Sequence, residues 1–156
     1  MREDSRTTGP AQTRRLAAIM FTDIVNFCRQ MGTDEARMLR LLEIHNDFIR
    51  RAVADHHGQI IKSTGDGFLL EFPSVVHAVQ CAQSLQGQLR IYNTDKGPTE
   101  QIHIRMGIHL GDIVSQQGDV HGDGVNIAAR LQTLAEPDTI CISDMVYRDV
   151  VTMRTL

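Results

Sequence analysis

The chain has 156 residues, 42% of them hydrophobic, and a formal net charge of -3. These values fit one domain with a single sizeable core. Lys and Arg are scattered along the sequence, which argues against a nucleic-acid or anionic-membrane partner. The longest apolar run, residues 16–21, is too short to insert into a membrane, and three cysteines without a CxxC pair favour a reducing, cytoplasmic compartment.

The N-terminal residues 1–14 are polar and contain Gly9 and Pro10. They lack apolar periodicity, so we expect a flexible tail or linker there and a folded domain over residues 15–156. Residues 16–21 form a short apolar run followed by Thr22 and Asp23, which predicts a buried strand that ends at a site.

Apolar residues recur at spacings of three and four over residues 34–57, which predicts an amphipathic helix. Thr33 or Asp34 is its expected N-cap, and Gly58 is its expected stop. Residues 59–64 and 67–72 are β-prone and flank a Gly-Asp-Gly turn, which predicts a hairpin. A second helix is expected over residues 74–92.

Residues 101–111 alternate apolar and polar side chains, which predicts a strand that residues 113–115 extend into another hairpin. A helix over 123–135, a strand over 139–142 and a short helix over 143–151 are expected to follow. The resulting order predicts an α+β fold with a ferredoxin-like βαββαβ core and an additional C-terminal strand and helix.

Asp23 and Asp66 each lie where a strand ends or turns, so their carboxylates can point into a cleft. Mg²⁺ prefers such oxygen ligands together with substrate phosphates, and a pair of ions can stabilise both oxygens of an in-line displacement. The alternatives are that Asp66 is only a turn residue and that Asp23 is only a helix N-cap.

Asn126 and Arg130 are four residues apart on the predicted helix, so they share one face and can reach one ligand. An arginine there can stabilise a phosphoryl transition state. The alternatives are a solvated stripe for this pair and an ordinary exposed strand lysine for Lys62. An EF-hand is excluded because position 12 of residues 119–130 is an arginine, and neither a P-loop nor an HExxH motif is present.

Three segments together resemble the class III adenylyl/guanylyl cyclase domain: residues 21–27, 62–72 and 118–130. The resemblance extends over roughly residues 15–151. It implies that Asp23 and Asp66 bind two Mg²⁺ or Mn²⁺ ions, with the backbone carbonyl of Ile24 completing the second site.

The resemblance also implies roles in binding the substrate. A turn of three residues would offer backbone N–H groups to the β- and γ-phosphates, namely Val25, Asn26 and Phe27. Arg105 would contact phosphate. Lys62 and Asp119 would read adenine at N1 and the exocyclic N6 amine, whereas a guanylyl cyclase is expected to have Glu and a small residue there.

Asn126 would orient the ribose, and Arg130 would stabilise charge at the α-phosphate. The implied reaction converts ATP to 3′,5′-cyclic AMP and pyrophosphate at two sites shared by a homodimer, under a fused or separate regulatory domain. The alternatives are a guanylate cyclase and a non-catalytic regulatory or dimerisation module with the same fold. Family members usually continue through a final β-hairpin, so we expect this domain to be truncated at its C-terminus.

Overall fold

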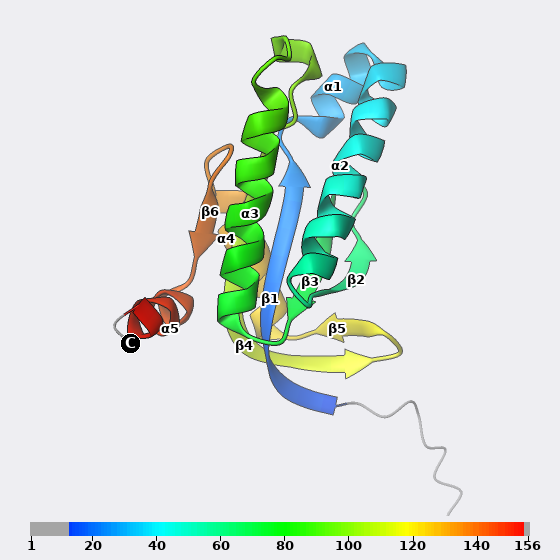
Figure 1. Ribbon diagram of the computed structural model, residues 1–156. Helices are drawn as coiled ribbons and strands as arrows, with labels where there is room; N and C mark the ends of the chain where they lie inside the picture. Colours follow the sequence, from blue (N-terminus) through cyan, green and yellow to red (C-terminus); the bar gives the residue numbers. More distant parts are fainter. Residues whose placement is uncertain (1–12, 155–156) are drawn as a thin grey trace, which may run out of the picture.

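The computed structural model describes residues 13–154, which form a mixed sheet with helices on both faces (Figure 1). The strands are β1 (Thr13–Ile24), β2 (Gln59–Ser63), β3 (Gly67–Phe72), β4 (Ile104–Gln116), β5 (Asp119–His121) and β6 (Ile140–Ile142). The helices are α1 (Phe27–Thr33), α2 (Glu35–Asp55), α3 (Val75–Asn93), α4 (Asp123–Leu134) and α5 (Asp144–Arg154), with a 3₁₀ turn at Pro98–Glu100. No helix in this part of the chain is both long and apolar enough to span a bilayer.

The strand order is β2-β3-β1-β4-β5, and each neighbouring pair on this path is antiparallel. The first four strands therefore have the arrangement of a ferredoxin-like core, as predicted. β6 pairs with β4 in parallel, and α5 follows it, so the additional C-terminal strand and helix are also confirmed.

The two faces of the sheet bury different amounts of apolar surface. Alternate residues of β1, including Ala18 and Met20, pack with α2 and α3 in the larger core cluster. The intervening residues Ala17 and Ile19 point the other way and pack with Ala128 of α4 in a smaller cluster. α2 and α3 thus cover one face, and α4 lies behind the sheet in Figure 1.

The ends of the long helices agree with the sequence signals. Asp34 caps α2, because its Oδ1 accepts the Arg37 backbone N–H at 3.1 Å. α3 differs slightly from the expectation, since Ser74, expected inside this helix, is its N-cap and accepts the N–H of His77. After α2, Gly58 donates its N–H to the carbonyl of Val53 at 2.9 Å, which closes the helix where it was expected to stop.

Three expectations need correction. β1 begins at Thr13, so residues 13–14 of the predicted tail are strand, held by pairing of Thr13 with Ser115; residues 1–12 lie outside the described part. α1 was not among the helices expected from apolar periodicity, and its N-cap is Asn26. β4 is one continuous strand, and its hairpin is made with β5 through a turn at Gln117 and Gly118, which have φ of 52° and 77°. Positive φ at both positions suits a two-residue hairpin.

Candidate functional site

Asp23 and Asp66 lie side by side at one end of the sheet. Asp23 is the penultimate residue of β1 and pairs directly with Gly67 of β3. Asp66 precedes Gly67 in the turn, and its carbonyl accepts the N–H of Ile24 at 2.8 Å. The N-cap alternative for Asp23 is wrong, because this residue lies within β1 and α1 begins only at Phe27.

The electrostatics of this end of the sheet show two carboxylates that repel each other. Burial raises the pKa of Asp66, and the nearby charge of Asp23 raises it further. Asp23 is held by Arg105 of β4, whose Nη2 and Nε donate to its two carboxylate oxygens at 2.9 and 3.2 Å. A divalent cation at this point would neutralise the repulsion, so the donor set fits a hard metal ion.

A close approach of backbones brings the two aspartates together. A Cβ added to Gly67 would overlap the carbonyl oxygen of Thr22, so only glycine allows β1 and β3 this spacing. Beneath this contact, the ring of His45 is fully buried and stacks on Phe68 with centroids 6.0 Å apart. Burial lowers the pKa of His45 to about 4, so this imidazole is neutral at physiological pH. Sequence reasoning assigned no role to His45.

The turn after β1 differs from the expectation in one respect. The N–H of Val25 donates to the carbonyl of His103 at 2.8 Å, so it is not available for phosphate. Asn26 has a left-handed backbone with φ of 59°, and α1 starts at the next residue. The expected backbone contacts to phosphate are therefore reduced to the N–H groups of Asn26 and Phe27.

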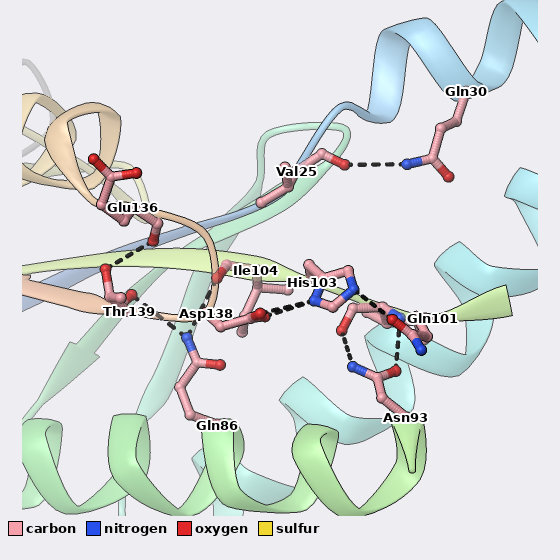
Figure 2. Close-up of polar contacts among 11 residues, drawn as sticks. Val25, Gln30, Gln86, Asn93, Gln101, His103, Ile104, Glu136, Asp138 and Thr139 are labelled. Atoms are coloured by element: carbon pink, nitrogen blue, oxygen red, sulfur yellow. Dashed lines mark hydrogen bonds and ion pairs between the residues drawn. The ribbon is translucent and has the colours of Figure 1, made fainter. Parts of the chain in front are cut away.

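A polar cluster behind this turn fixes the position of His103. Figure 2 shows its ring between Asp138 and Gln101, with Nδ1 2.8 Å from the Asp138 carboxylate and Nε2 3.0 Å from the Gln101 side-chain oxygen. Asn93 at the end of α3 anchors the adjoining segment by donating to the carbonyl of Ile102 and accepting its N–H, each at 2.8 Å. The turn after β1 is thus tied through His103 to a hydrogen-bonded segment just before β4.

Lys62 and Asp119 form an ion pair although their residues are far apart in the chain. Lys62 Nζ lies 3.1 Å from Asp119 Oδ1 and 3.3 Å from Oδ2. The N–H of Val120 and then Lys62 lower the pKa of Asp119, which keeps the carboxylate an acceptor. His121, to which no role was assigned, places its Nε2 3.7 Å from the same carboxylate. Lys62 is an exposed strand lysine, as the alternative interpretation had it, and it also holds this ion pair with Asp119.

Asn126 and Arg130 are both exposed on α4. Glycines allow α4 to lie close to the sheet, since a Cβ on Gly107 would overlap the backbone of Gln132. Within the described chain no contact joins Asn126 or Arg130 to the two aspartates. The connection between these regions is Arg105, whose Nη1 donates to the carbonyl of Thr133 at 3.3 Å.

Residues 13–154 hold no group of three or more His, Cys, Asp or Glu side chains that could bind a metal. Any ion at Asp23 and Asp66 would therefore need further oxygens from backbone, water or a bound phosphate. This ligand set is typical of Mg²⁺ sites that share the ion with a nucleotide.

A ferredoxin-like sheet with two neighbouring aspartates at one end defines an α+β domain with a donor set that could hold a metal ion, and comparison with known proteins specifies the family. Residues 10–154 match the family model described as adenylate and guanylate cyclase catalytic domain. A putative adenylate cyclase 3 of Rhizobium meliloti is 42% identical over 138 residues, which are 88% of this chain and 24% of that protein. The chain therefore belongs to the adenylate and guanylate cyclase catalytic domain family.

Two solved structures share the fold. An adenylate/guanylate cyclase/hydrolase from Silicibacter pomeroyi superposes with a TM-score of 0.84 at 37% identity, covering 94% of this chain and 84% of that one. The adenylyl cyclase CyaB from P. aeruginosa superposes with a TM-score of 0.74 at 23% identity, covering 88% and 81%. The chain spans about a quarter of the length of the Rhizobium relative.

Proposed function

We propose that this domain converts ATP to 3′,5′-cyclic AMP and pyrophosphate at two sites shared between two copies of the chain. The observation that carries the catalytic part is the juxtaposition of Asp23 and Asp66 at one end of a cyclase-family sheet: Asp23 pairs with Gly67, and the Asp66 carbonyl accepts the N–H of Ile24. A non-catalytic module with this fold would have no chemical need for two mutually repelling carboxylates at one end of β1 and β3. We further propose that a regulatory domain, fused or separate, controls this activity.

Two Mg²⁺ or Mn²⁺ ions fit the carboxylate pair, with the carbonyl of Ile24 as a further ligand. Such ions would lower the pKa of the ribose 3′-hydroxyl and stabilise charge on the phosphates. Asp23 and Asp66 would hold them, and the N–H groups of Asn26 and Phe27 would bind phosphate oxygens at the start of the helix. Arg105 is close enough to Asp23 to supply positive charge to the same phosphates.

The preference for ATP rests on Lys62 and Asp119. The ion pair presents an ammonium donor beside a carboxylate acceptor, which is the pattern that adenine needs at N1 and the exocyclic N6 amine. Guanine presents a donor and an acceptor in the reverse order. It would place its N1 donor against Lys62 and its carbonyl oxygen against Asp119, so both contacts would be unfavourable.

The proposal of a homodimer is supported by the face of the sheet that carries α4. Phe21, Ile61 and Val125 are only partly buried there, and Leu134 at the end of α4 is 73% exposed. Beside them lies Arg130, which lines a shallow hollow of about 380 Å³ with Leu134. An apolar area next to functional groups suits a protein interface.

In the proposed site, Asn126 and Arg130 of one subunit act on nucleotide held by Asp23 and Asp66 of the other. Asn126 would orient the ribose so that its 3′-oxygen lies in line with the α-phosphorus. Arg130 would stabilise the negative charge that develops at the α-phosphate as pyrophosphate leaves. A homodimer would contain two equivalent sites, and a single chain would contain two halves.

The direct test is to incubate the purified protein with ATP or GTP and Mg²⁺ or Mn²⁺ and to separate the products. We expect cyclic AMP to form from ATP in proportion to the dimer concentration. Absence of any cyclic nucleotide, also from a version extended at the C-terminus, would contradict the catalytic proposal.

Shared sites are tested by mixing two inactive variants. Asp23→Ala and Arg130→Ala chains should regain part of the activity when combined, because one site of the mixed dimer has all its residues. Arg148→Ala is the matched control, since Arg148 pairs with exposed Asp144 on α5 and should keep full activity alone. Mixed dimers that form but stay inactive would argue against sites built from two chains.

A further inference from the structure

Arg105 engages both oxygens of the carboxylate that we propose as a metal ligand. It lies directly opposite Asp23 on the neighbouring strand, and both side chains are largely buried, with exposed fractions of 28% and 17%. The two hydrogen bonds, at 2.9 and 3.2 Å, form the parallel fork that arginine makes with carboxylates. Facing residues on paired strands are held within reach of each other, so this contact is built into the sheet.

A second contact holds the guanidinium from the other side. Arg105 Nη1 donates to the carbonyl of Thr133, in the last turn of α4. Carbonyls at a helix C-terminus have no partner within the helix and carry partial negative charge, so they favour a cation. Arg105 therefore bridges the metal end of the sheet and the helix that carries Arg130.

The two aspartates are not equivalent in this arrangement. Asp23 is engaged by Arg105, whereas Asp66 forms no ion pair within residues 13–154 and has a pKa raised by burial and by Asp23. A divalent cation that binds Asp66 without a nucleotide would lie near the guanidinium of Arg105, which is paired with the carboxylate of Asp23. Repulsion between the two cations would weaken its binding.

We infer that Arg105 is a gate on the metal site: it holds Asp23 while no nucleotide is bound and moves to the triphosphate when one arrives. This inference rests on the proposed function, since it takes Asp23 as a metal ligand. Phosphate oxygens offer the guanidinium another bidentate partner, so the transfer exchanges one charge-assisted pair for another. Asp23 then becomes available to the cation that enters with the phosphates.

Because Arg105 leaves Asp23 only when phosphate is present, binding of the metal and binding of the nucleotide become cooperative. Each ligand must improve the affinity for the other by the same factor, because the coupling is reciprocal. The domain would bind a free divalent cation weakly and the cation together with a nucleotide tightly.

The test measures Mn²⁺ binding to the whole chain by the electron paramagnetic resonance signal of free Mn²⁺, without nucleotide. Arg105→Lys keeps the positive charge but loses the two-pronged contact, and we expect it to bind Mn²⁺ about tenfold more tightly than the unaltered chain. Arg105→Gln should bind at least as tightly. Arg40→Gln is the matched control, since it removes an arginine from a different ion pair, the one with Glu100 at 2.7 Å, and should leave Mn²⁺ binding unchanged.

A second measurement adds a non-hydrolysable ATP analogue with a methylene group between the α- and β-phosphorus atoms. The analogue should tighten Mn²⁺ binding by a larger factor in the unaltered chain than in Arg105→Lys. Equal factors in the two proteins would overturn the gate. The gate would also be overturned if the unaltered chain bound Mn²⁺ as tightly without the analogue as with it. This outcome needs no variant, so it holds even if a variant fails to fold.

The outcomes separate this inference from the proposed function. If Asp23→Asn abolishes Mn²⁺ binding but both Arg105 variants bind Mn²⁺ alone like the unaltered chain, the metal site stands and the gate is wrong. The second outcome uses the Arg105→Gln chain as the background. If adding Asp23→Asn and Asp66→Asn to it leaves Mn²⁺ binding unchanged, the two aspartates do not bind the metal, and both the metal site and the gate are wrong. Circular dichroism melts establish that each variant is folded.

Discussion

Exchanging Lys62 and Asp119, the pair that we propose reads the purine, should change which nucleotide the domain prefers. In Lys62→Glu combined with Asp119→Cys, the donor and acceptor that suit adenine are removed, and a carboxylate able to accept from guanine N1 is introduced. An exposed ion pair contributes only about 0–1 kcal/mol to stability. Lys62 and Asp119 are 46% and 37% exposed, so the double variant should remain folded.

The size of the effect follows from the two hydrogen bonds at stake. At about 1.5 kcal/mol each, their loss for ATP amounts to about 3 kcal/mol in the transition state, or roughly 100-fold in kcat/KM. The new contacts to guanine act in the same direction. The ratio of kcat/KM for ATP to that for GTP should therefore fall by at least roughly 100-fold, and each single variant should show an intermediate ratio.

The assay measures initial rates of cyclic AMP and cyclic GMP formation at several concentrations of each nucleotide. Arg40→Glu combined with Glu100→Cys is the matched control, because it likewise replaces the cation by Glu and the acid by Cys in an exposed ion pair of 2.7 Å elsewhere. The control should keep the original ratio. A Lys62 and Asp119 double variant that is folded and active but still prefers ATP to the same degree would refute the assignment of this pair.

Three further changes test the supporting structure. Gly67→Ala should lower the free energy of unfolding by about 3 kcal/mol and remove most of the activity, because its Cβ would force β1 away from β3. Gly87→Ala, in open space within α3, should instead raise the free energy of unfolding by about 0.5–1 kcal/mol. Chemical denaturation measures both changes, and a Gly67→Ala chain as stable as the unaltered one would contradict the close approach of the strands. Asp66→Asn should abolish activity yet raise the melting temperature at pH 7 without metal. The raised pKa means that ionised Asp66 destabilises the fold, so the difference should shrink as the pH falls through that pKa; a lower melting temperature at pH 7 would count against this. Leu134→Gln should leave the fold intact but weaken dimers in sedimentation velocity, since this side chain is 73% exposed in the single chain; unchanged association would place the interface elsewhere.

The parts of the fold that could be predicted from the sequence are those with local signals. The N-caps Asp34 and Ser74 are followed by long amphipathic helices, so both helix starts could be inferred from neighbouring residues. α1 gave no such signal, because it is short and has no buried residue. β5 has only three residues, and its pairing with β4 depends on left-handed backbone at Gln117, which is unusual for this residue type.

Contacts within the candidate site could not be predicted from local sequence signals. Lys62 and Asp119 lie on β2 and β5, at opposite ends of the strand path, so no spacing in the sequence could predict that they meet. Their assignment came from resemblance to the family, and the ion pair supplies the contact. The N–H of Val25 shows the reverse case. Family resemblance offered it to phosphate, whereas the carbonyl of His103, just before β4, already accepts it. Long-range backbone contacts of this kind depend on the completed fold.

Side chains along β1 alternate between two faces of the sheet, so the residues of the larger core and the proposed metal ligand lie on opposite faces. Met20 and its alternate neighbours are buried under α2 and α3 in the larger cluster, whereas Asp23 follows Ala17 and Ile19 on the face with the smaller one. Arg105 pairs with Asp23 in register, so it reaches the same face. A side chain such as Arg105 that must exchange one partner for another needs a sparsely covered surface, because close packing in a core would resist its movement. The face that contributes less to stability is thus the one on which a guanidinium can exchange a carboxylate for a phosphate.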